Sequence, residues 1–161
     1  MKRRLCLQGA WALASGSTLV GCTSTPPPTL RPNQWAGRLV LHIHDTPPQR
    51  HSATFELLGN ALNGELNLLN PLGTTVAQAR WAPGLAYLQQ GSQTQSYADM
   101  PSLLQAATGA ALPLDAVFDW LQGTATHTPG WDVDLTQHAQ GRIRASRNTP
   151  QPSVQLLIVL E

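Results

Sequence analysis

Three histidines in the first half of the chain are the residues best suited to bind a metal ion. His42 and His44 are two positions apart, so a β-strand would place them on one face, and His51 follows after a short turn. Metal-ligating histidines are usually oriented by a carboxylate, and none is fixed beside this face, which also carries Arg38. We therefore predict solvent-facing histidines and no metal site.

Two carboxylates offer a second candidate site, for acid–base chemistry. Asp115 and Asp119 lie one helical turn apart, but near the start of a predicted helix they more simply stabilise its dipole. The chain has no Gly-x-Ser-x-Gly motif, no phosphate-binding glycine-rich loop and no His-Glu-x-x-His motif. We therefore predict that the protein is not an enzyme and uses no cofactor.

The charge balance argues against nucleic acid as a partner. The chain has 161 residues, with 10 Lys and Arg against 9 Asp and Glu. Three of these cations are Lys2, Arg3 and Arg4, and the seven others are scattered arginines, whereas a nucleic-acid surface or a polybasic membrane anchor needs clustered cations. The two cysteines, Cys6 and Cys22, precede the predicted domain, which excludes a disulfide scaffold or a thiolate metal site within it.

Residues 1–21 have the order of a bacterial secretory signal peptide. A positive start precedes a mostly apolar segment, residues 5–20, which is shorter than the roughly 20 residues of a membrane-spanning helix. The tetrapeptide Leu-Val-Gly-Cys that ends at Cys22 resembles the lipobox, which implies cleavage before this cysteine and its lipidation. Thr23 follows in place of Asp, which by resemblance to enteric sorting rules implies the outer membrane, with the protein facing the periplasm. The alternative is a plain signal peptide with an incidental cysteine.

The rest of the chain divides into a short linker and one domain. Residues 22–34 hold the lipidated cysteine and a Pro- and Thr-rich stretch, which is typical of a flexible tether. Residues 35–161 are enough for one domain with one modest core.

Within the domain, apolar and polar residues alternate in short segments separated by turn signals, which is typical of antiparallel strands. The predicted strands lie near residues 35–43, 53–57, 62–68, 75–82, 85–90, 93–97, 131–136, 142–147 and 154–160. A helical period interrupts them twice. Asp99 is expected to cap a short helix that Gly109 ends, and a second helix, ended by Gly123, carries an apolar stripe through Val117 and Leu121. The fold class is therefore mainly β with a helical insertion (α+β), in which a curled antiparallel sheet must cover the two apolar stripes.

Several short motifs, taken in order, resemble the LolB family of outer-membrane lipoprotein receptors. They extend over essentially the whole predicted domain, and their order and spacing are more specific than any one of them. The motifs are Trp35-x-Gly37-Arg38, Asn70-Pro71-Leu72-Gly73, Tyr97-Ala98-Asp99, Thr108-Gly109, Leu112-Pro113-Leu114, Trp120-Leu121-Gln122-Gly123 and Gly130-Trp131-x-Val133. The tail, Val159-Leu160-Glu161, departs from the closing segment with a tryptophan that the family would lead us to expect, which puts the last strand's contribution to a cavity in doubt.

The resemblance implies an incomplete antiparallel β-barrel with a short-helix lid over an apolar cavity. It also implies that this cavity takes lipoprotein acyl chains from the periplasmic carrier LolA and passes them to the inner leaflet of the outer membrane. Leu72, between Pro71 and Gly73, is expected to protrude and contact the membrane, and the protein is expected to act as a monomer. The expected cavity and lid residues are Leu39, Leu41, Phe55, Leu66, Leu68, Val117, Phe118, Trp120 and Leu121.

Other interpretations stay open at this level. The nine cavity residues could pack a closed core, and Leu72 could fold back onto the barrel. The protein could be a lipoprotein of the same shape that binds another hydrophobic ligand or scaffolds an envelope complex, which a cavity too small for several acyl chains would favour. A periplasmic hydrolase would need a His–carboxylate pair beside a serine in a cleft.

Overall fold

The computed structural model describes residues 33–161, so the predicted signal peptide, Cys22 and most of the tether lie outside the described residues. Nine strands and two α-helices occur in the described part, with one short 3₁₀ turn. The elements are β1 (Gln34–His44), β2 (Gln49–Gly59), β3 (Gly64–Leu69), β4 (Thr75–Ala82), β5 (Leu85–Gln90), β6 (Gln93–Tyr97), α1 (Met100–Thr108), α2 (Leu114–Leu121), β7 (Trp131–Asp134), η1 (His138–Gln140), β8 (Arg142–Arg147) and β9 (Ser153–Leu160).

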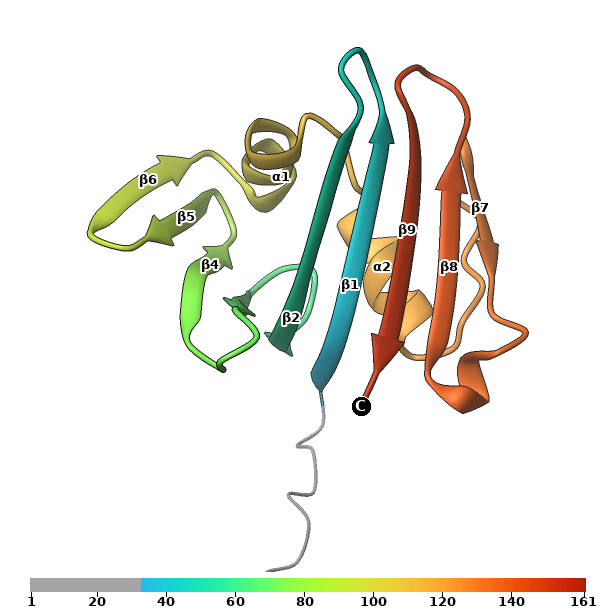
Figure 1. Ribbon diagram of the computed structural model, residues 1–161, viewed down its shortest axis with the longest axis horizontal. Helices are drawn as coiled ribbons and strands as arrows, with labels where there is room; N and C mark the ends of the chain where they lie inside the picture. Colours follow the sequence, from blue (N-terminus) through green and yellow to red (C-terminus); the bar gives the residue numbers. More distant parts are fainter. Residues whose placement is uncertain (1–32) are drawn as a thin grey trace, which may run out of the picture.

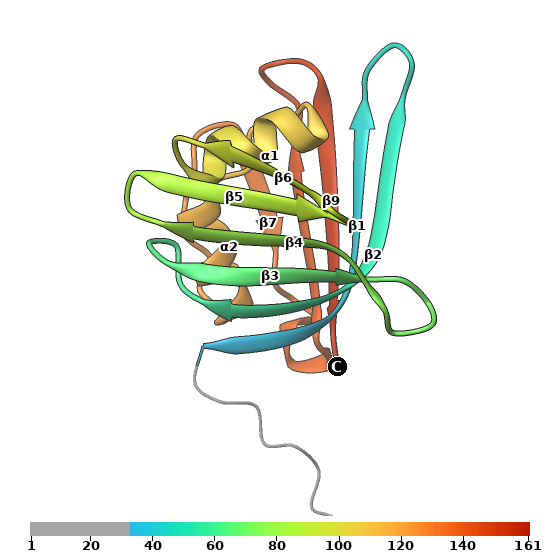
Figure 2. The same ribbon diagram turned by 90° about the vertical axis from the view of Figure 1, so that its left-hand side faces the viewer.

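All nine strands form a single antiparallel sheet in the order β6-β5-β4-β3-β2-β1-β9-β8-β7. The sheet does not close, because β6 and β7 are its two edges. Figures 1 and 2 show that it curls, so that its two halves enclose α1 and α2 on the concave side. This confirms the predicted fold class, an incomplete barrel with a helical insertion.

The pairing of β1 with β9 lies in the interior of the sheet, where it joins the first and last strands of the domain. Gly37 permits their close approach, because a Cβ at this position would lie only 2.0 Å from the carbonyl oxygen of Val159. The last strand therefore completes the sheet without the tryptophan that the family resemblance led us to expect.

The alternation of side chains along each strand builds the core. Alternate residues of β1 and β9 lie on the concave face, where Ile43, Val154 and Ile158 are buried. Each such side chain contributes about 1.5–3 kcal/mol when it leaves water. The core draws on elements from β1 to β9, so a chain that begins at residue 23 retains all of it.

The helices begin and end where the sequence predicts. The Asp99 carboxylate caps α1 by accepting a 2.8 Å hydrogen bond from the backbone N–H of Ser102, and Gly109 ends the helix at φ 74°. Hydrogen bonds from the hydroxyl and the backbone N–H of Ser102 lower the pKa of Asp99. In residues 33–161, no helix is both long and apolar enough to cross a membrane.

Arg147 fastens the connection between the helices to the sheet. This guanidinium, in a residue only 7% exposed, donates to the carbonyl oxygens of Ala111 at 3.2 Å and Pro152 at 3.3 Å. It also lies over the ring of Trp131, 5.6 Å from the ring centroid. The α1–α2 connection is therefore held against β8, the β8–β9 turn and the start of β7.

The predicted start of the third strand was wrong. The side chain of Asn60 accepts hydrogen bonds from the backbone N–H groups of Leu62 and Asn63, which bends residues 60–63 into a turn. The strand β3 therefore begins at Gly64, and Leu62 is 68% exposed instead of facing the core. Local capping by an asparagine overrode the apolar alternation here.

Candidate functional site

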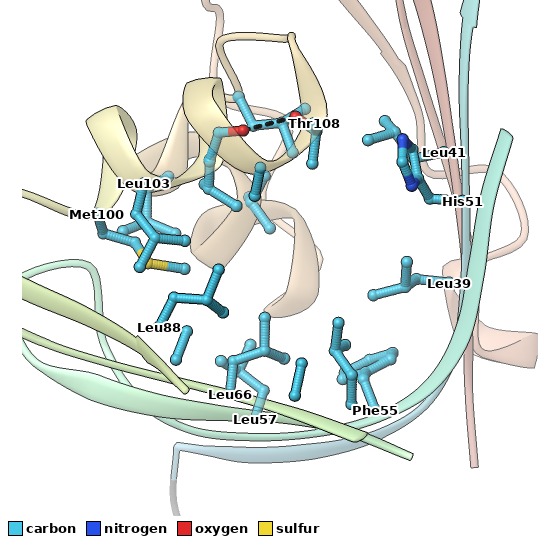
Figure 3. Close-up of a pocket in the computed structure, with 18 of the residues that line it drawn as sticks. Leu39, Leu41, His51, Phe55, Leu57, Leu66, Leu88, Met100, Leu103 and Thr108 are labelled. Atoms are coloured by element: carbon cyan, nitrogen blue, oxygen red, sulfur yellow. Dashed lines mark hydrogen bonds between the residues drawn. The ribbon is translucent and has the colours of Figure 1, made fainter. Parts of the chain in front are cut away.

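An apolar cavity of about 260 Å³ lies between the concave face of the sheet and the two helices (Figure 3). Its walls come from β1 to β5, from β9 and from both helices with their connection. Eight of the nine residues that the sequence predicts for the cavity lie in its wall. They are Leu39, Leu41, Phe55, Leu66, Leu68, Val117, Phe118 and Leu121.

The ninth residue, Trp120, is not in the cavity wall. It is fully buried and packs against Trp131, with ring centroids 5.9 Å apart. Its ring lies toward β7, because Trp131 is the first residue of that strand. Leu121, about 100° away around α2, faces the cavity instead. The expectation of a lining role for Trp120 was therefore wrong, because its neighbours on the helix stripe face a different part of the interior.

Other wall residues were missed at the sequence level. Met100 and Leu103 reach the cavity from α1, and Leu156 and Ile158 reach it from β9. The first pair follows a helical period and the second a strand period, so both signals were present in the sequence. The doubt about the last strand is thus resolved, since β9 does supply part of the wall.

One end of the cavity is closed by aromatic rings. Phe118 lies between two tryptophans, with its ring centroid 5.5 Å from that of Trp35 and 6.3 Å from that of Trp81. The indole N–H of Trp81 donates to the carbonyl oxygen of Asn60 at 3.0 Å, which fixes this ring without placing a polar atom in the cavity. The wall at this end is therefore apolar and held in place.

His51 is the unexpected polar residue of the cavity. The prediction that it faces solvent was wrong, because it shares the concave face with Phe55 and pairs with Leu41 of β1. Figure 3 shows its ring on the cavity side of β2. Its Nε2 atom is buried and has no hydrogen-bond partner. The signal was its position, four residues before Phe55, which gives both side chains the same face.

Two other polar residues border the cavity, Gln90 and Thr108. The Thr108 hydroxyl is already satisfied, since it donates to the carbonyl oxygen of Leu104 at 2.7 Å. Gln90 is exposed at the end of β5. The remaining lining residues are apolar, so the cavity offers almost no polar contact to a ligand.

The loop between β3 and β4 presents Leu72 to solvent. Leu72 is 90% exposed, and the side-chain oxygen of Asn70 accepts hydrogen bonds from the N–H groups of Leu72 at 2.9 Å and Thr74 at 3.0 Å. The backbone N–H of Gly73 also donates to the Asn70 carbonyl oxygen at 2.9 Å. Pro71 and Gly73 are exposed as well, and Figure 2 shows the loop projecting from the sheet. The loop is therefore fixed by hydrogen bonds, and its exposed leucine packs against no core residue.

Comparison with known proteins places this architecture. The sequence model of the family described as "Outer membrane lipoprotein LolB" matches residues 33–155. The chain belongs to the LolB family. It is 32% identical to the outer-membrane lipoprotein LolB of Bordetella petrii, an alignment that covers 84% of this chain and 74% of the relative. The LolB of Cellvibrio japonicus is also 32% identical, with 84% and 72% covered, and that of Bordetella pertussis is 25% identical, with 89% and 86% covered.

Among residues 33–161 of this LolB-family chain, no Asp, Glu, Lys or Arg side chain lines the cavity. Arg80 and Glu65 form a 3.0 Å ion pair on the convex face, and His42 and His44 lie on the same face of β1, with ring centroids 6.3 Å apart. Among residues 33–161, no three His, Cys, Asp or Glu side chains are grouped as a metal site would require. The concave face therefore supplies an apolar container, and the convex face supplies the solvated charges.

Proposed function

We propose that this chain is an outer-membrane lipoprotein receptor, which accepts lipoproteins from the periplasmic carrier LolA and inserts them into the outer membrane. The observation that carries the proposal is the apolar cavity enclosed by the curled sheet and the helices. Each acyl CH₂ group costs about 0.8 kcal/mol when exposed to water, so a lipidated protein crosses an aqueous space only when its chains are covered. Membership of the LolB family supports this use of the cavity.

In this proposal the helices that cover the cavity move apart from the sheet during uptake. A volume of about 260 Å³ lies below the roughly 300–1,000 Å³ of pockets that hold drug-sized ligands. Two or three acyl chains are larger than such ligands, so uptake requires the helices to separate from the sheet. The packing of α1 supports this, because it rests on β5 and β6 at the open edge of the sheet.

Transfer in this proposal makes and breaks no covalent bond. The chain has no nucleotide-binding motif, so cargo moves from a weaker cavity in the carrier to a stronger one here, and then to the bilayer. The receptor acts as a monomer, with no cofactor and no catalytic residue.

The second part of the proposal concerns the membrane. Signal peptide 1–21 is removed, Cys22 carries the acyl chains that anchor the protein at the periplasmic face of the outer membrane, and Leu72 contacts the bilayer during release. Stable anchoring takes more than one chain, and a single leucine is too weak to replace it. In this proposal residues 22–34 tether the domain to the lipidated cysteine, so that the Leu72 loop can turn toward the same membrane.

A second candidate function is supported by the small cavity. A LolB-like lipoprotein that binds a single-chain hydrophobic ligand would need little or no lid opening. The two functions differ in cargo, because only the receptor strips a multiply acylated lipoprotein from its carrier.

The test is a transfer assay with residues 23–161. LolA loaded with a labelled triacylated lipoprotein is mixed with this domain and then with liposomes, and Leu72→Glu is run in parallel. We expect the wild type to take the cargo and pass it on, and the variant to take it without passing it on. A wild type that binds palmitate but leaves the lipoprotein on LolA would establish the second candidate and overturn the receptor.

A further inference from the structure

The two ends of the cavity differ in chemistry. Trp81 pairs with Ala86, and Gln90 is four residues further along β5, which corresponds to about 13 Å. Across the sheet, Trp81 of β4 pairs with Gly64 of β3, and Gly64 pairs with Gly59 of β2, so Gly59 marks the level of the aromatic rings on β2. His51 is eight residues from Gly59, a distance of about 26 Å along the strand. Both polar side chains therefore lie on the same side of the aromatic rings along the strands, Gln90 about half as far from them as His51, and we call this side the polar end of the cavity.

The polar end is also the open end. Gln90 and Ala107 line the cavity there, and both are exposed, whereas Trp81 and Phe118 at the other end are buried. A protein whose acyl chains occupy this cavity must leave its polypeptide outside. The polypeptide of the cargo therefore emerges at the polar end, and the methyl ends of its acyl chains point toward the aromatic end.

His51 lies at the polar end of the cavity, where this orientation would place the junction between the acyl chains and the polar head. Acyl chains are attached through ester or amide groups, whose carbonyl oxygens accept hydrogen bonds and lose their water partners on entry. The buried Nε2 of His51 has no partner in the protein, whereas the hydroxyl of Thr108, another polar residue of the wall, already donates to the carbonyl oxygen of Leu104. Among the residues that line the cavity, His51 alone has a buried, unpaired side-chain polar atom.

We propose that His51 is the residue that binds the acyl carbonyl of the cargo. With its proton on Nε2, the ring donates a hydrogen bond to an ester or amide carbonyl oxygen, the chains run from there toward Trp81 and Phe118, and the head leaves past Gln90. This inference rests on the proposed function. It adds the orientation of the bound acyl chains and the residue that recognises the ester or amide group that attaches them. An ester carbonyl also occurs in phospholipids, so the test must separate the two sources.

The experiment compares an ester with an ether. The domain of residues 23–161 is titrated with a cysteine peptide that carries an S-dipalmitoylglyceryl group and with its S-dihexadecylglyceryl ether counterpart, which lacks the carbonyl oxygens. We expect the wild type to bind the ester about three- to tenfold more tightly, as one hydrogen bond allows. His51→Phe, which keeps an aromatic ring but has no donor, should bind the two peptides equally. Thr108→Val is the matched control, and it should keep the wild-type preference.

Each outcome separates the inference from the proposed function. Equal binding of both peptides by the wild type would overturn the role of His51 and leave the cavity as an acyl-chain site. A preference that survives in His51→Phe would do the same. Failure of the wild type to bind either peptide would overturn the proposed function itself. Thermal melting checks that each variant folds, and His51→Leu replaces His51→Phe if the latter does not.

Two further arms test the source and the orientation. Dipalmitoyl phosphatidylglycerol is titrated in parallel, and a His51-dependent preference for this phospholipid without binding of the lipopeptide would overturn the assignment to cargo. For orientation, a nitroxide at the chain terminus should quench tryptophan fluorescence more than one beside the carbonyl, and Trp81→Phe should reduce this difference. Stronger quenching by the label beside the carbonyl would mean that the chains enter in the opposite direction.

Discussion

Replacing Leu72 with glutamate should slow the release of cargo to membranes while leaving cargo uptake and folding unchanged. Leu72 is 90% exposed and contacts no core residue, so its loss removes no packing. Surface substitutions of this kind usually change the free energy of unfolding by less than about 0.5 kcal/mol. Any large effect on release must therefore come from a contact that forms outside the folded domain.

The magnitude follows from the area that Leu72 exposes. Moving a fully exposed leucine side chain from water into an apolar environment is worth about 1.5–3 kcal/mol. If this contact forms in the step that releases cargo, its loss corresponds to a rate about ten- to hundredfold lower. Leu72→Phe, which keeps an apolar tip on the same loop, should release cargo at close to the wild-type rate.

The assay loads the domain with labelled lipoprotein and follows transfer to liposomes by flotation. Leu62→Glu is the matched control, because Leu62 is a second exposed leucine in a turn, at the opposite end of β3 and about 17 Å from the Leu72 loop along the strand. We expect this control to release cargo normally. If both glutamate variants slow release equally, general surface hydrophobicity and not the Leu72 loop directs transfer, and the reasoning fails.

Three other predictions concern the framework of the cavity. Arg147→Ala should lower the free energy of unfolding by about 2–3 kcal/mol in urea denaturation, because it removes the two hydrogen bonds of a buried guanidinium and its contact with an indole ring. The control Arg144→Ala, at an exposed arginine, should lower it by less than about 1 kcal/mol. Equal losses would contradict the role of Arg147 in holding the helix connection. Ala77→Phe should fill the cavity and weaken binding of the acylated peptide at least about tenfold without lowering the melting temperature, while Val76→Phe, on the opposite face of β4, should bind normally. The hydrogen bonds that lower the pKa of Asp99 stabilise the folded protein fully above the pKa of a free aspartate, and this stabilisation is lost as pH falls through the lower pKa of the folded state. Asp99→Asn should remove this pH dependence from acid unfolding curves. An unchanged curve would contradict the prediction.

The course of the backbone could be predicted largely from local signals. The period of two marks the strands, and the period near 3.6, with an aspartate before α1 and glycines after both helices, marks the two helices. The exception at Leu62 has a local cause too, since an asparagine side chain can satisfy two backbone N–H groups and so form a turn within an apolar segment. Motif order supplied the family, which the comparisons then showed.

The site was harder to predict, because periodicity gives the face of a residue and not what that face meets. His51 shares a face with Phe55, but its polarity led us to predict that it faces solvent. In the folded protein this face curls around the helices, and His51 lines the cavity between them and the sheet. Trp120 lies among lining residues in sequence, but its ring packs on Trp131, which is eleven positions later in the chain. Both outcomes depend on long-range packing, which a single sequence does not encode in any short window.

The sequence by itself determined the strands, the helices, the apolar faces and the exposed leucine in the β3–β4 loop, since these depend on residues close together along the chain. Only the tertiary structure decided the cavity of about 260 Å³, its aromatic and polar ends, and the position of His51 within it. The physical reason is that a cavity is the space left between elements. Its size and lining depend on the curl of nine strands and on the distance at which two short helices come to rest.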